Sequence, residues 1–553
     1  MKLPKGPLVI TLLVCSLTQP VFSQHAATAT NMNVADYGAL GNDDKDDSLA
    51  IQTAINAAHS GETLFIPNGH YKLSTAIKAK SDIKIQGESQ AGTVIELTGD
   101  NNFAMFDLSN TSNVELTSFT LDGKMRSVAN GIFAKNGSGH TIHFITIQNL
   151  SFNGFGPHGI FFEGNSEWKE AVTHSQLTDN TFSNIGVGSE WGAAIRFANG
   201  SSHNHALRNT ITKTGRGGIL ANNGATDLII SNNTITGIGK TIEGLAIEVH
   251  TECNRALIED NIVEHWISLD KTNDSAIRRN TVHSNKLDDW KYAGLELAGG
   301  SNNIFTDNQV SQGTKVGISI SIDYPKEYVF WGRNNISHSA DWGAQLQGDA
   351  IGLSYQYFYQ NHFSNTYRNH PQSTYKDQGH GFRVNGNSHH ITLEDNIFNG
   401  NRGLGVEFSG KNIDQFTFIN NVLSDNQQGA ITAYPGSDLH WRGNHAMRNN
   451  NNATPASSGF KNSALPTADF TSPKQVKLHT PIKFINASHS NNAGGSIAHV
   501  LWDLGQGLPH TTANPTHSYT QPGTFRVTLI AWDERGRAAR KEQLIEVIAT
   551  TDR

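Results

Sequence analysis

Residues 244–250 read GLAIEVH, a glycine followed by alternating positions, and segments of this kind recur between Gly192 and Thr432. Each segment is short and rich in β-branched residues, with one apolar face and one face left free. The others read GAAIRF (192–197), GGILANN (217–223), GLELAGG (294–300), VGISISID (316–323), GFRVNG (381–386) and GLGVEFSG (403–410). The sequence therefore predicts a stack of similar coils, and any chemistry is expected on the free face.

An asparagine followed by any residue and then an apolar residue accompanies these segments. The mean spacing of this motif is about 26 residues, which lies in the range that indicates a solenoid, propeller or repeat array. The asparagines are Asn180, Asn209, Asn233, Asn261, Asn280, Asn308, Asn334, Asn361, Asn396, Asn421 and Asn444.

The composition limits the classes of partner. The chain has 553 residues, 16% of them charged, and a formal net charge of −7. This length allows more than one domain. The charge gives no indication of a nucleic-acid partner, and a mildly acidic surface is compatible with binding an anionic polymer, since binding depends on the local field.

The first 23 residues, MKLPKGPLVITLLVCSLTQPVFS, have the features of a signal peptide: a basic start, an apolar core and a small-residue exit. The apolar run is too short to span a membrane. We therefore expect a secreted protein, extracellular or periplasmic, that is monomeric and not membrane-bound. Cys15 would leave with the signal, so Cys253 remains alone and no internal disulfide is expected.

The N-terminal region contains a motif that resembles one of a known family. Residues 34–58, VADYGALGNDDKDDSLAIQTAINAA, predict a helix capped by Asp46 or Asp47, and LFIPNGHYKL follows at 64–73. This pattern resembles the pectate-lyase superfamily domain shared with rhamnogalacturonases and epimerases. The resemblance implies an all-β, right-handed parallel β-helix over residues 31–447 that acts on an extracellular polysaccharide. Lyases, hydrolases, epimerases and phage tailspikes share it, so it does not select a reaction.

A second domain is expected after residues 448–466, whose Asn-, Ser-, Ala- and Pro-rich composition is typical of a linker. Residues 467–549 contain WDLGQG (502–507) and PGTFRVTL (522–529), and they resemble a PKD domain, an Ig-like β-sandwich. Such modules space or dock a catalytic part on its polymer. The usual W-x-F-G-D-G reads W-D-L-G-Q-G here, so no metal is inferred from it.

Aligning the glycine-led segments predicts two outward files of side chains, because side chains alternate with a period of two along a strand. The first file is Phe161, Arg196, Leu220, Glu248, Ser268, Glu296, Ser319, Gln345, Arg383, Glu407 and Thr432. The second file is Glu163, Ala198, Asn222, His250, Asp270, Ala298, Ser321, Gln347, Asn385 and Ser409. The central rows are the richest in titratable groups, and such clustering marks a candidate site.

The first interpretation of this face is a polysaccharide lyase acting on a uronate-containing glycan by β-elimination. That reaction needs a base for the proton beside the carboxylate and a cation to hold the developing charge. Lys271 or His250 is the candidate base, and Arg196 is the candidate charge partner. The substrate-binding candidates are Arg216, Asn222, Arg383 and Gln345.

Two other interpretations remain open. A glycoside hydrolase would use Glu248 with Asp270 or Glu296. Parallel strands lie about 4.8 Å apart, so Glu248 and Glu296 would be about 9.6 Å apart, near the upper end of the range for inverting enzymes. A non-catalytic glycan-binding adhesin would use the charged rows only as a docking surface.

Two shorter resemblances concern individual residues. The run from Glu264 to Thr272 resembles the coil of the chondroitinase-B and alginate-lyase family that carries the catalytic lysine and a calcium-binding glutamate. It implies Lys271 as base, Glu264 as one metal ligand and Ca²⁺ as the candidate cofactor; Trp266 and Ala298 depart from the family pattern. GPHG at 156–159 resembles the Asp-Pro-His segment of mannuronan epimerases, without its Asp.

Overall fold

A computed structural model describes residues 31–99, 103–126, 129–136, 141–168, 171–238, 244–283, 293–311, 315–321, 324–367, 379–436, 438–455 and 464–549. The expected signal peptide lies outside the described residues. No helix in these ranges is both long enough and apolar enough to cross a membrane.

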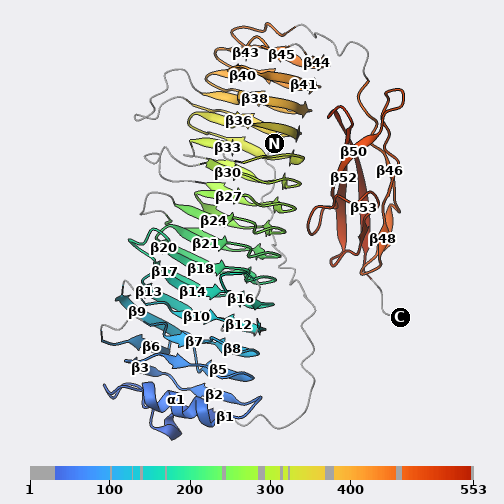
Figure 1. The fold of residues 1–553 in the computed structure, drawn as a ribbon. Coiled ribbons are helices and arrows are strands. Elements are labelled where there is room, and N and C mark those ends of the chain that lie inside the picture. The colour runs from blue at the N-terminus through green and yellow to red at the C-terminus, as the bar shows by residue number, and fades with distance from the viewer. Residues whose placement is uncertain are drawn as a thin grey trace, which may run out of the picture.

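Figure 1 shows a long stack of coils with a separate β-rich unit beside its upper part. Within one coil, a strand of the third sheet is followed by a front strand and then by a lateral strand, as in β17 (Thr181–Ile185), β18 (Ala193–Ala198) and β19 (His205–Leu207). Each strand pairs in parallel with the corresponding strand of the next coil. The predicted all-β parallel β-helix is thus confirmed.

The coils have three walls: the front file, the lateral file and the third sheet. The long strands β36 and β38 turn the corner between the first two walls, so the front and lateral files are hydrogen-bonded into one 28-stranded sheet. The other front strands are β4 (Ile77–Lys78), β7 (Phe106–Asp107), β10 (Ile132–Lys135), β14 (His158–Glu163), β21 (Gly217–Asn222), β24 (Leu245–His250), β27 (Trp266–Asp270), β30 (Ala293–Leu297), β33 (Val316–Ile320), β40 (Leu404–Ser409) and β43 (Gly429–Ile431).

The lateral file begins with β1 (Asn31–Asn33) and ends with β44 (Leu439–Arg442). Between them lie β2 (Thr63–Ile66), β5 (Ile83–Gly87), β8 (Val114–Thr117), β12 (Ile145–Gln148), β16 (Gln176–Thr178), β22 (Ile229–Ser231), β25 (Leu257–Glu259), β28 (Ala276–Arg278), β31 (Ile304–Thr306), β34 (Val329–Gly332), the later parts of β36 (Trp342–Tyr359) and β38 (His380–Glu394), and β41 (Ile413–Ile419).

The third sheet has 15 strands. Besides β17 it contains β3 (Gly69–Leu73), β6 (Thr93–Leu97), β9 (Thr120–Arg126), β13 (Ser151–Phe155), β20 (Thr210–Thr214), β23 (Thr234–Thr236), β26 (Ile262–Glu264), β29 (Thr281–His283), β32 (Gln309–Ser311), β35 (Asn335–Ser337), β37 (His362–Ser364), β39 (Ile397–Asn399), β42 (Val422–Ser424) and β45 (His445–Met447).

The repeated asparagines form a buried ladder at the turn between the lateral file and the third sheet. Oδ1 of Asn308 accepts hydrogen bonds from the main-chain N–H (3.0 Å) and the Nδ2–H (3.1 Å) of Asn280. Asn308 in turn donates from both groups to Oδ1 of Asn334, and its Nδ2 also donates to the Ile277 carbonyl. The same pattern links successive asparagines from Asn180 to Asn444. The ladder amides are therefore satisfied by the coils on either side of them.

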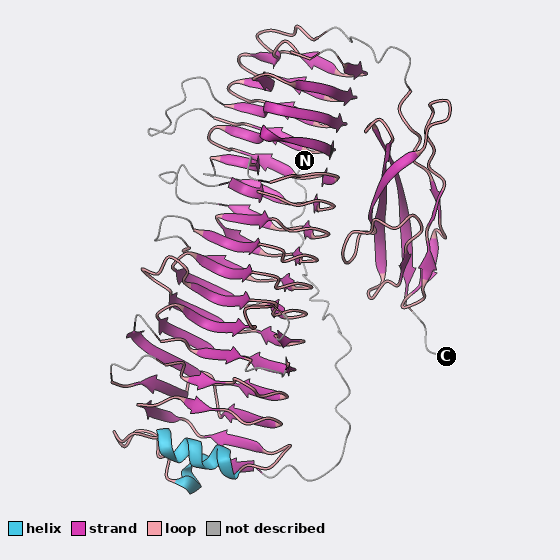
Figure 2. Cartoon of the chain, in the orientation of Figure 1, coloured by secondary structure: helices cyan, strands magenta, loops and turns pink. Residues whose placement is uncertain are grey.

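The N-terminal end of the column is closed by a helix, as Figures 1 and 2 show. Helix α1 (Ser48–Ala57) begins after Asp47 and buries Ile51, Ala54 and Ile55 against the first coils. Asp46 accepts hydrogen bonds from the main-chain N–H and the hydroxyl of Ser48, so both predicted aspartates lie at the start of the helix. The helix removes an open sheet end from water.

The C-terminal unit is a β-sandwich whose largest sheet has the order β47 (Gln475–Lys477), β53 (Ala538–Ile548), β52 (Gly523–Asp533) and β50 (Ile497–Asp503). Its short strands are β46 (Phe470–Thr471), β48 (Ile482–Lys483), β49 (Ile485–Asn486) and β51 (Thr516–His517). Trp502 is fully buried in its core.

This unit packs on the lateral file of the β-helix. Nη2 of Arg278 lies 2.9 Å from Oδ1 of Asp503, and both side chains are only 2% exposed. Arg540 pairs with Glu394 at 3.1 Å. One apolar cluster spans the two units: Leu257, Ala276, Ile304, Phe330, Tyr357, Tyr359, Leu501, Ile530, Trp532 and Ala538. The β-sandwich is therefore held by a buried interface and is not a freely tethered spacer.

We predict that Asn308→Ala lowers the free energy of unfolding by at least about 2 kcal/mol, because it leaves buried donors of Asn280 and the Ile277 carbonyl without partners. Chemical denaturation measures the change. The control is Asn335→Ala, which removes an exposed amide bonded to Gln309. Equal stability of the two variants would contradict the structural role of the ladder.

We also predict that Asp503→Asn costs about 3–5 kcal/mol, because it leaves the Arg278 guanidinium buried without a counter-charge. Asp425→Asn breaks the exposed pair with Arg448 and should cost less than about 1 kcal/mol. Thermal denaturation compares the stability of the two variants. A similar small loss of stability in each would mean that the interface does not depend on the buried pair.

Candidate functional site

The strand pairing fixes the register of the front face. Arg196 pairs with Leu220, Leu220 with Glu248, Glu248 with Ser268, and Ser268 with Glu296. The file continues through Ser319, Gln345, Arg383 and Glu407. In the second file, Asn222 pairs with His250 and His250 with Asp270. The register predicted from the glycine-led segments is confirmed.

The central side chains point away from the core. On β24, Ile247 and Val249 are fully buried in the interior, so Glu248 and His250 between and beyond them lie on the outer face. Glu248 is nevertheless only 8% exposed, because neighbouring side chains cover it. The face is thus a partly shielded surface in which charges interact more strongly than in water.

Arg216 and Glu248 form a bidentate pair at the centre of this face. Nε of Arg216 donates to Oε2 of Glu248 at 3.1 Å, and Nη2 donates to Oε1 at 2.9 Å. The Arg216 guanidinium carbon also lies 4.5 Å from the centre of the Trp191 ring. Planar pairing and ring contact hold the guanidinium in one orientation.

Arg196 is the second oriented cation. Its Nε donates to Oδ1 of Asn222 at 3.1 Å, and Nη1 lies 3.3 Å from Nε2 of His158. Burial and the charge of Arg196 lower the pKa of His158 to about 3, so the imidazole is neutral and can accept this hydrogen bond. His158 belongs to the GPHG segment, which the structure therefore places beside Arg196.

His250 lies where these charges converge. Burial is the main cause that lowers its pKa below the usual 6.5; Arg216 and Arg196 also lower it, while Glu248 and Asp270 raise it. Nδ1 of His250 lies 2.9 Å from the Thr251 hydroxyl. The imidazole is neutral at neutral pH, and a neutral imidazole is a suitable proton acceptor.

Lys271 occupies a different environment. It follows β27 in a left-handed turn with φ 49°, and Nζ lies 3.8 Å from the centre of the Tyr324 ring. Its hydrogen bond to Tyr324 is the main cause that raises the pKa of Lys271, so the amine stays protonated. Of the two bases that the sequence suggests, the geometry favours His250 and gives Lys271 the character of a cation.

The predicted carboxylates share the same rows. Oε2 of Glu296 accepts a hydrogen bond from the Ser268 hydroxyl at 2.7 Å. Ser268 lies between Glu248 and Glu296, so two rungs separate these carboxylates, as the alignment predicts. Asp270 is directly paired with His250 on the adjacent strand.

Gln345 and Arg383 lie farther along the helix, four and five rungs beyond Glu248, and so about 19 Å and 24 Å away. The guanidinium carbon of Arg383 lies 4.9 Å from the Trp342 ring centre, and Nη2 donates to the Ser409 hydroxyl. These two predicted binding residues are in line with the central group but do not touch it.

The calcium hypothesis is not supported by a ligand cluster. Glu264 lies on β26 in the third sheet, and its carboxylate accepts the main-chain N–H of Gly237. In the part of the chain that the structure describes, no three His, Cys, Asp or Glu side chains are grouped as a metal site.

Two residues contact the site in ways that the sequence did not predict. Trp191, which directly precedes the GAAIRF segment, contacts both central arginines, with the Arg196 guanidinium carbon 5.9 Å from its ring centre. The thiol of Cys253 donates to the His250 carbonyl at 3.0 Å, and burial raises its pKa to about 12. The first supports the cations, and the second is a structural, unreactive thiol.

Sequence profiles of known families agree with this architecture. The profile described as "Right handed beta helix region" matches residues 93–266 and 265–453. The chain belongs to the right-handed β-helix family. The profile described as "Rhamnogalacturonase A/epimerase, pectate lyase-like" matches residues 31–114, and that described as "PKD domain" matches residues 463–548. Both resemblances noted in the sequence are thereby confirmed.

Individual relatives of this β-helix protein match over shorter stretches. Mannuronan C5-epimerase AlgE3 of Azotobacter vinelandii is 29% identical over 239 residues, which cover 38% of this chain and 12% of that protein. Alginate lyase 7 of the same organism is 28% identical over 193 residues, 30% and 22% of the two chains. The chain thus spans less than a quarter of either relative.

Among solved structures, the A-module of mannuronan C-5 epimerase AlgE6 of Azotobacter vinelandii shows 18% identity and a TM-score of 0.37, over 77% of this chain and 100% of that module.

We predict that Glu248→Gln lowers the free energy of unfolding by about 1–3 kcal/mol, because the half-buried Arg216 loses its charged acceptor. The control is Glu252→Gln, an exposed carboxylate in the turn after the same strand. Chemical denaturation compares the two. Equal denaturation midpoints of the two variants would show that the Arg216–Glu248 pair does not stabilise the front face.

Proposed function

We propose that this protein is a polysaccharide-active enzyme that removes the C5 proton of a uronate residue and cleaves the chain by β-elimination. The observation that carries the proposal is the convergence of a neutral His250 with two oriented cations, Arg196 and Arg216, on one face. Support also comes from relatives whose names specify a C5-epimerase and an alginate lyase. C5 epimerisation and β-elimination both begin with loss of the C5 proton.

The first step assigns one role to each group. The tautomer of His250 that donates from Nδ1 to Thr251 leaves the lone pair on Nε2, which takes the C5 proton. The C–H electrons pass into the uronate carboxylate, and the guanidinium groups of Arg196 and Arg216 stabilise that charge. Their orientation by Asn222, Glu248 and Trp191 limits the reorganisation that the step requires.

The second step breaks the C4–O bond while the C4=C5 double bond forms. The departing oxygen needs a proton, and Lys271, which stays protonated beside Asp270, is the proposed donor. Asp270 lies next to His250 and stabilises the imidazolium formed in the first step. Gln345 and Arg383 would bind sugar residues farther along the same file.

The hydrolase alternative is less well supported by the geometry. Both oxygens of Glu248 accept hydrogen bonds from Arg216, which leaves neither free to protonate a glycosidic oxygen. A glycosidase needs one carboxyl group for that purpose.

The proposal is tested with mannuronan, guluronan, polygalacturonate and chondroitin, using the full chain. New ultraviolet absorbance from an unsaturated uronide supports the lyase. Deuterium at C5 without cleavage, measured by NMR in D₂O, would keep the proton abstraction but make the protein an epimerase. New reducing ends without absorbance would indicate a hydrolase, and retention without any reaction would indicate an adhesin.

We predict that His250→Ala reduces kcat by at least about 10²-fold, the scale of a lost general base. His445→Ala, an exposed histidine near the end of the β-helix, is the control and should retain normal turnover. A normal rate in His250→Ala would remove His250 from the mechanism.

The pH profile gives an independent check. A base acts in its deprotonated form, and burial places the pKa of His250 below 6.5. We therefore predict that kcat/KM falls at acid pH with a midpoint below pH 6.5. An acid limb centred above 6.5 would contradict His250 as the base.

A further inference from the structure

A ladder of outward side chains runs along the corner between the front and lateral files. Each coil contributes one residue with φ between 54° and 63°, and the strand pairing aligns these residues one above the other. We call it the corner ladder: Phe144, His174, His203, Asp227, Arg255, Asp274, Asn302, Tyr328, Tyr355 and His390. Its rings and charged groups are therefore presented at the spacing of the coils.

The later part of the corner ladder is covered by the C-terminal domain. The rings of Tyr328 and His499 stack with centroids 3.9 Å apart, and Trp532 meets Tyr328 edge-on at 5.3 Å. Tyr355 stacks on His390 at 4.9 Å, where Gly536 approaches. In this part, one ring of the C-terminal domain, that of His499, therefore stacks face to face on the corner ladder.

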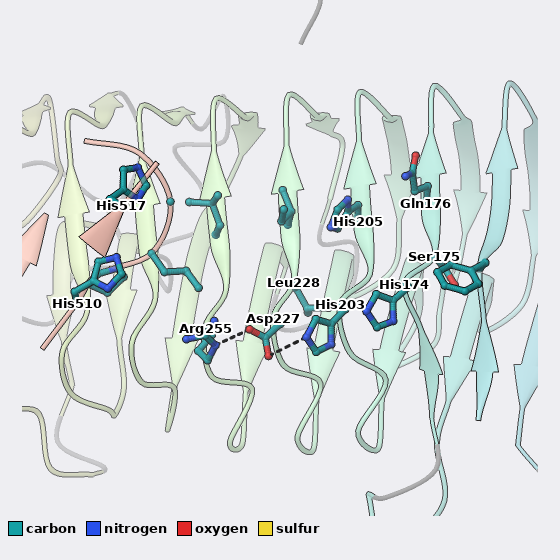
Figure 3. A pocket seen from close by; sticks show the side chains of 16 residues that line it. His174, Ser175, Gln176, His203, His205, Asp227, Leu228, Arg255, His510 and His517 are labelled. Carbon is teal, nitrogen blue, oxygen red and sulfur yellow. Dashed lines mark hydrogen bonds and ion pairs between the residues drawn. The ribbon is translucent and has the colours of Figure 1, made fainter. Parts of the chain in front are cut away.

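The earlier part of the corner ladder lines an open groove of about 690 Å³ between the β-helix and the C-terminal domain. Figure 3 shows His174 and His203 following one another along the β-helix, with His510 and His517 of the C-terminal domain also lining the groove. The rings of His174 and His203 are parallel within 9° and 4.7 Å apart. Apolar walls come from Phe144, Leu228, Ile229, Leu257, Leu508 and Pro509.

The polar groups of this groove are largely uncharged. Burial lowers the pKa of His174, His205 and His510, and that of His517 to about 4. The two permanent charges lie together: Nε of Arg255 contacts Oδ1 of Asp227, whose Oδ2 also lies 3.7 Å from Nε2 of His203. No described His, Cys, Asp or Glu side chains group as a metal site here.

The imidazoles also have hydrogen-bonding capacity that the protein does not use. Nδ1 of His205 and Nε2 of His517 are buried and have no hydrogen-bond partner among the described residues. Such atoms are rare in folded proteins and call for a water or a ligand. A ligand suited to the groove has flat apolar faces and many hydroxyl groups, and carries no charge.

We propose that this groove is a second carbohydrate-binding site, separate from the front face, that takes a neutral pyranose chain. A pyranose ring presents an apolar face to the stacked rings of His174 and His203 and hydroxyl groups to the surrounding imidazoles. A polyuronate is disfavoured because Arg255 is already paired with Asp227. A second protein surface is disfavoured because the groove is concave and bounded by two domains.

The test removes the stacked rings of His174 and His203 without straining the backbone. The double variant His174→Asn, His203→Asn keeps residues that tolerate the left-handed conformation. The control is His338→Asn, an exposed histidine with φ 58° at another corner. The full-length proteins are bound to cellulose, chitin, starch, β-1,3-glucan, mannan and xylan, and to polygalacturonate as the anionic probe.

We expect retention of the parent and of His338→Asn on at least one neutral polysaccharide, with affinity about tenfold weaker in the double variant. No retention on any neutral polymer, equal retention of the double variant, or retention only on polygalacturonate would overturn the proposal. Turnover of short soluble uronate oligomers should be unchanged in the double variant. A failure of this binding site is thereby distinguished from a failure of the proposed reaction.

Discussion

The hydrogen bonds that hold each coil in register on the next are the constraint on which the whole molecule depends. The Asn ladder fixes that register from inside, because each side chain satisfies the main-chain N–H of one coil and a carbonyl group of another. A shift of one residue would strand these amides and would turn the apolar face outward. Stacking in one register also converts residues distant along the chain into neighbours on one wall.

That wall gathers charges which would repel one another if they were not paired. Glu248 and Asp270 lie on adjacent strands, and Arg216 and Arg196 lie beside them. The arrangement leaves a neutral imidazole between oriented cations, which is the combination that proton removal beside a carboxylate requires. The proposed chemistry follows from this balance of charges rather than from any single residue.

The sequence predicted the fold, the capping helix, the second domain and the register of the front face. Those features depend on local patterns: a glycine-led alternating strand, a repeated asparagine and two family motifs. It did not predict the Arg216–Glu248 pair or the contact of Trp191 with both arginines, because Arg216 and Trp191 lie in loops before the strands, where the alternating pattern does not fix the direction of a side chain. The pattern also suggests Lys271 as a base, because it does not reveal the contact of Lys271 with Tyr324.

The packing of the C-terminal domain could not be predicted from the sequence, because Arg278 and Asp503 are 225 residues apart and the WDLGQG motif that contains Asp503 does not indicate its partner. Their pair fixes the domain against the lateral file and shapes the groove at the corner ladder.

The most direct test of the central claim is a crystal structure of His250→Ala with a bound uronate oligosaccharide. We predict a sugar carboxylate on Arg196 and Arg216, with the C5 atom facing residue 250. An oligosaccharide on another wall, or a carboxylate directed away from both arginines, would contradict it.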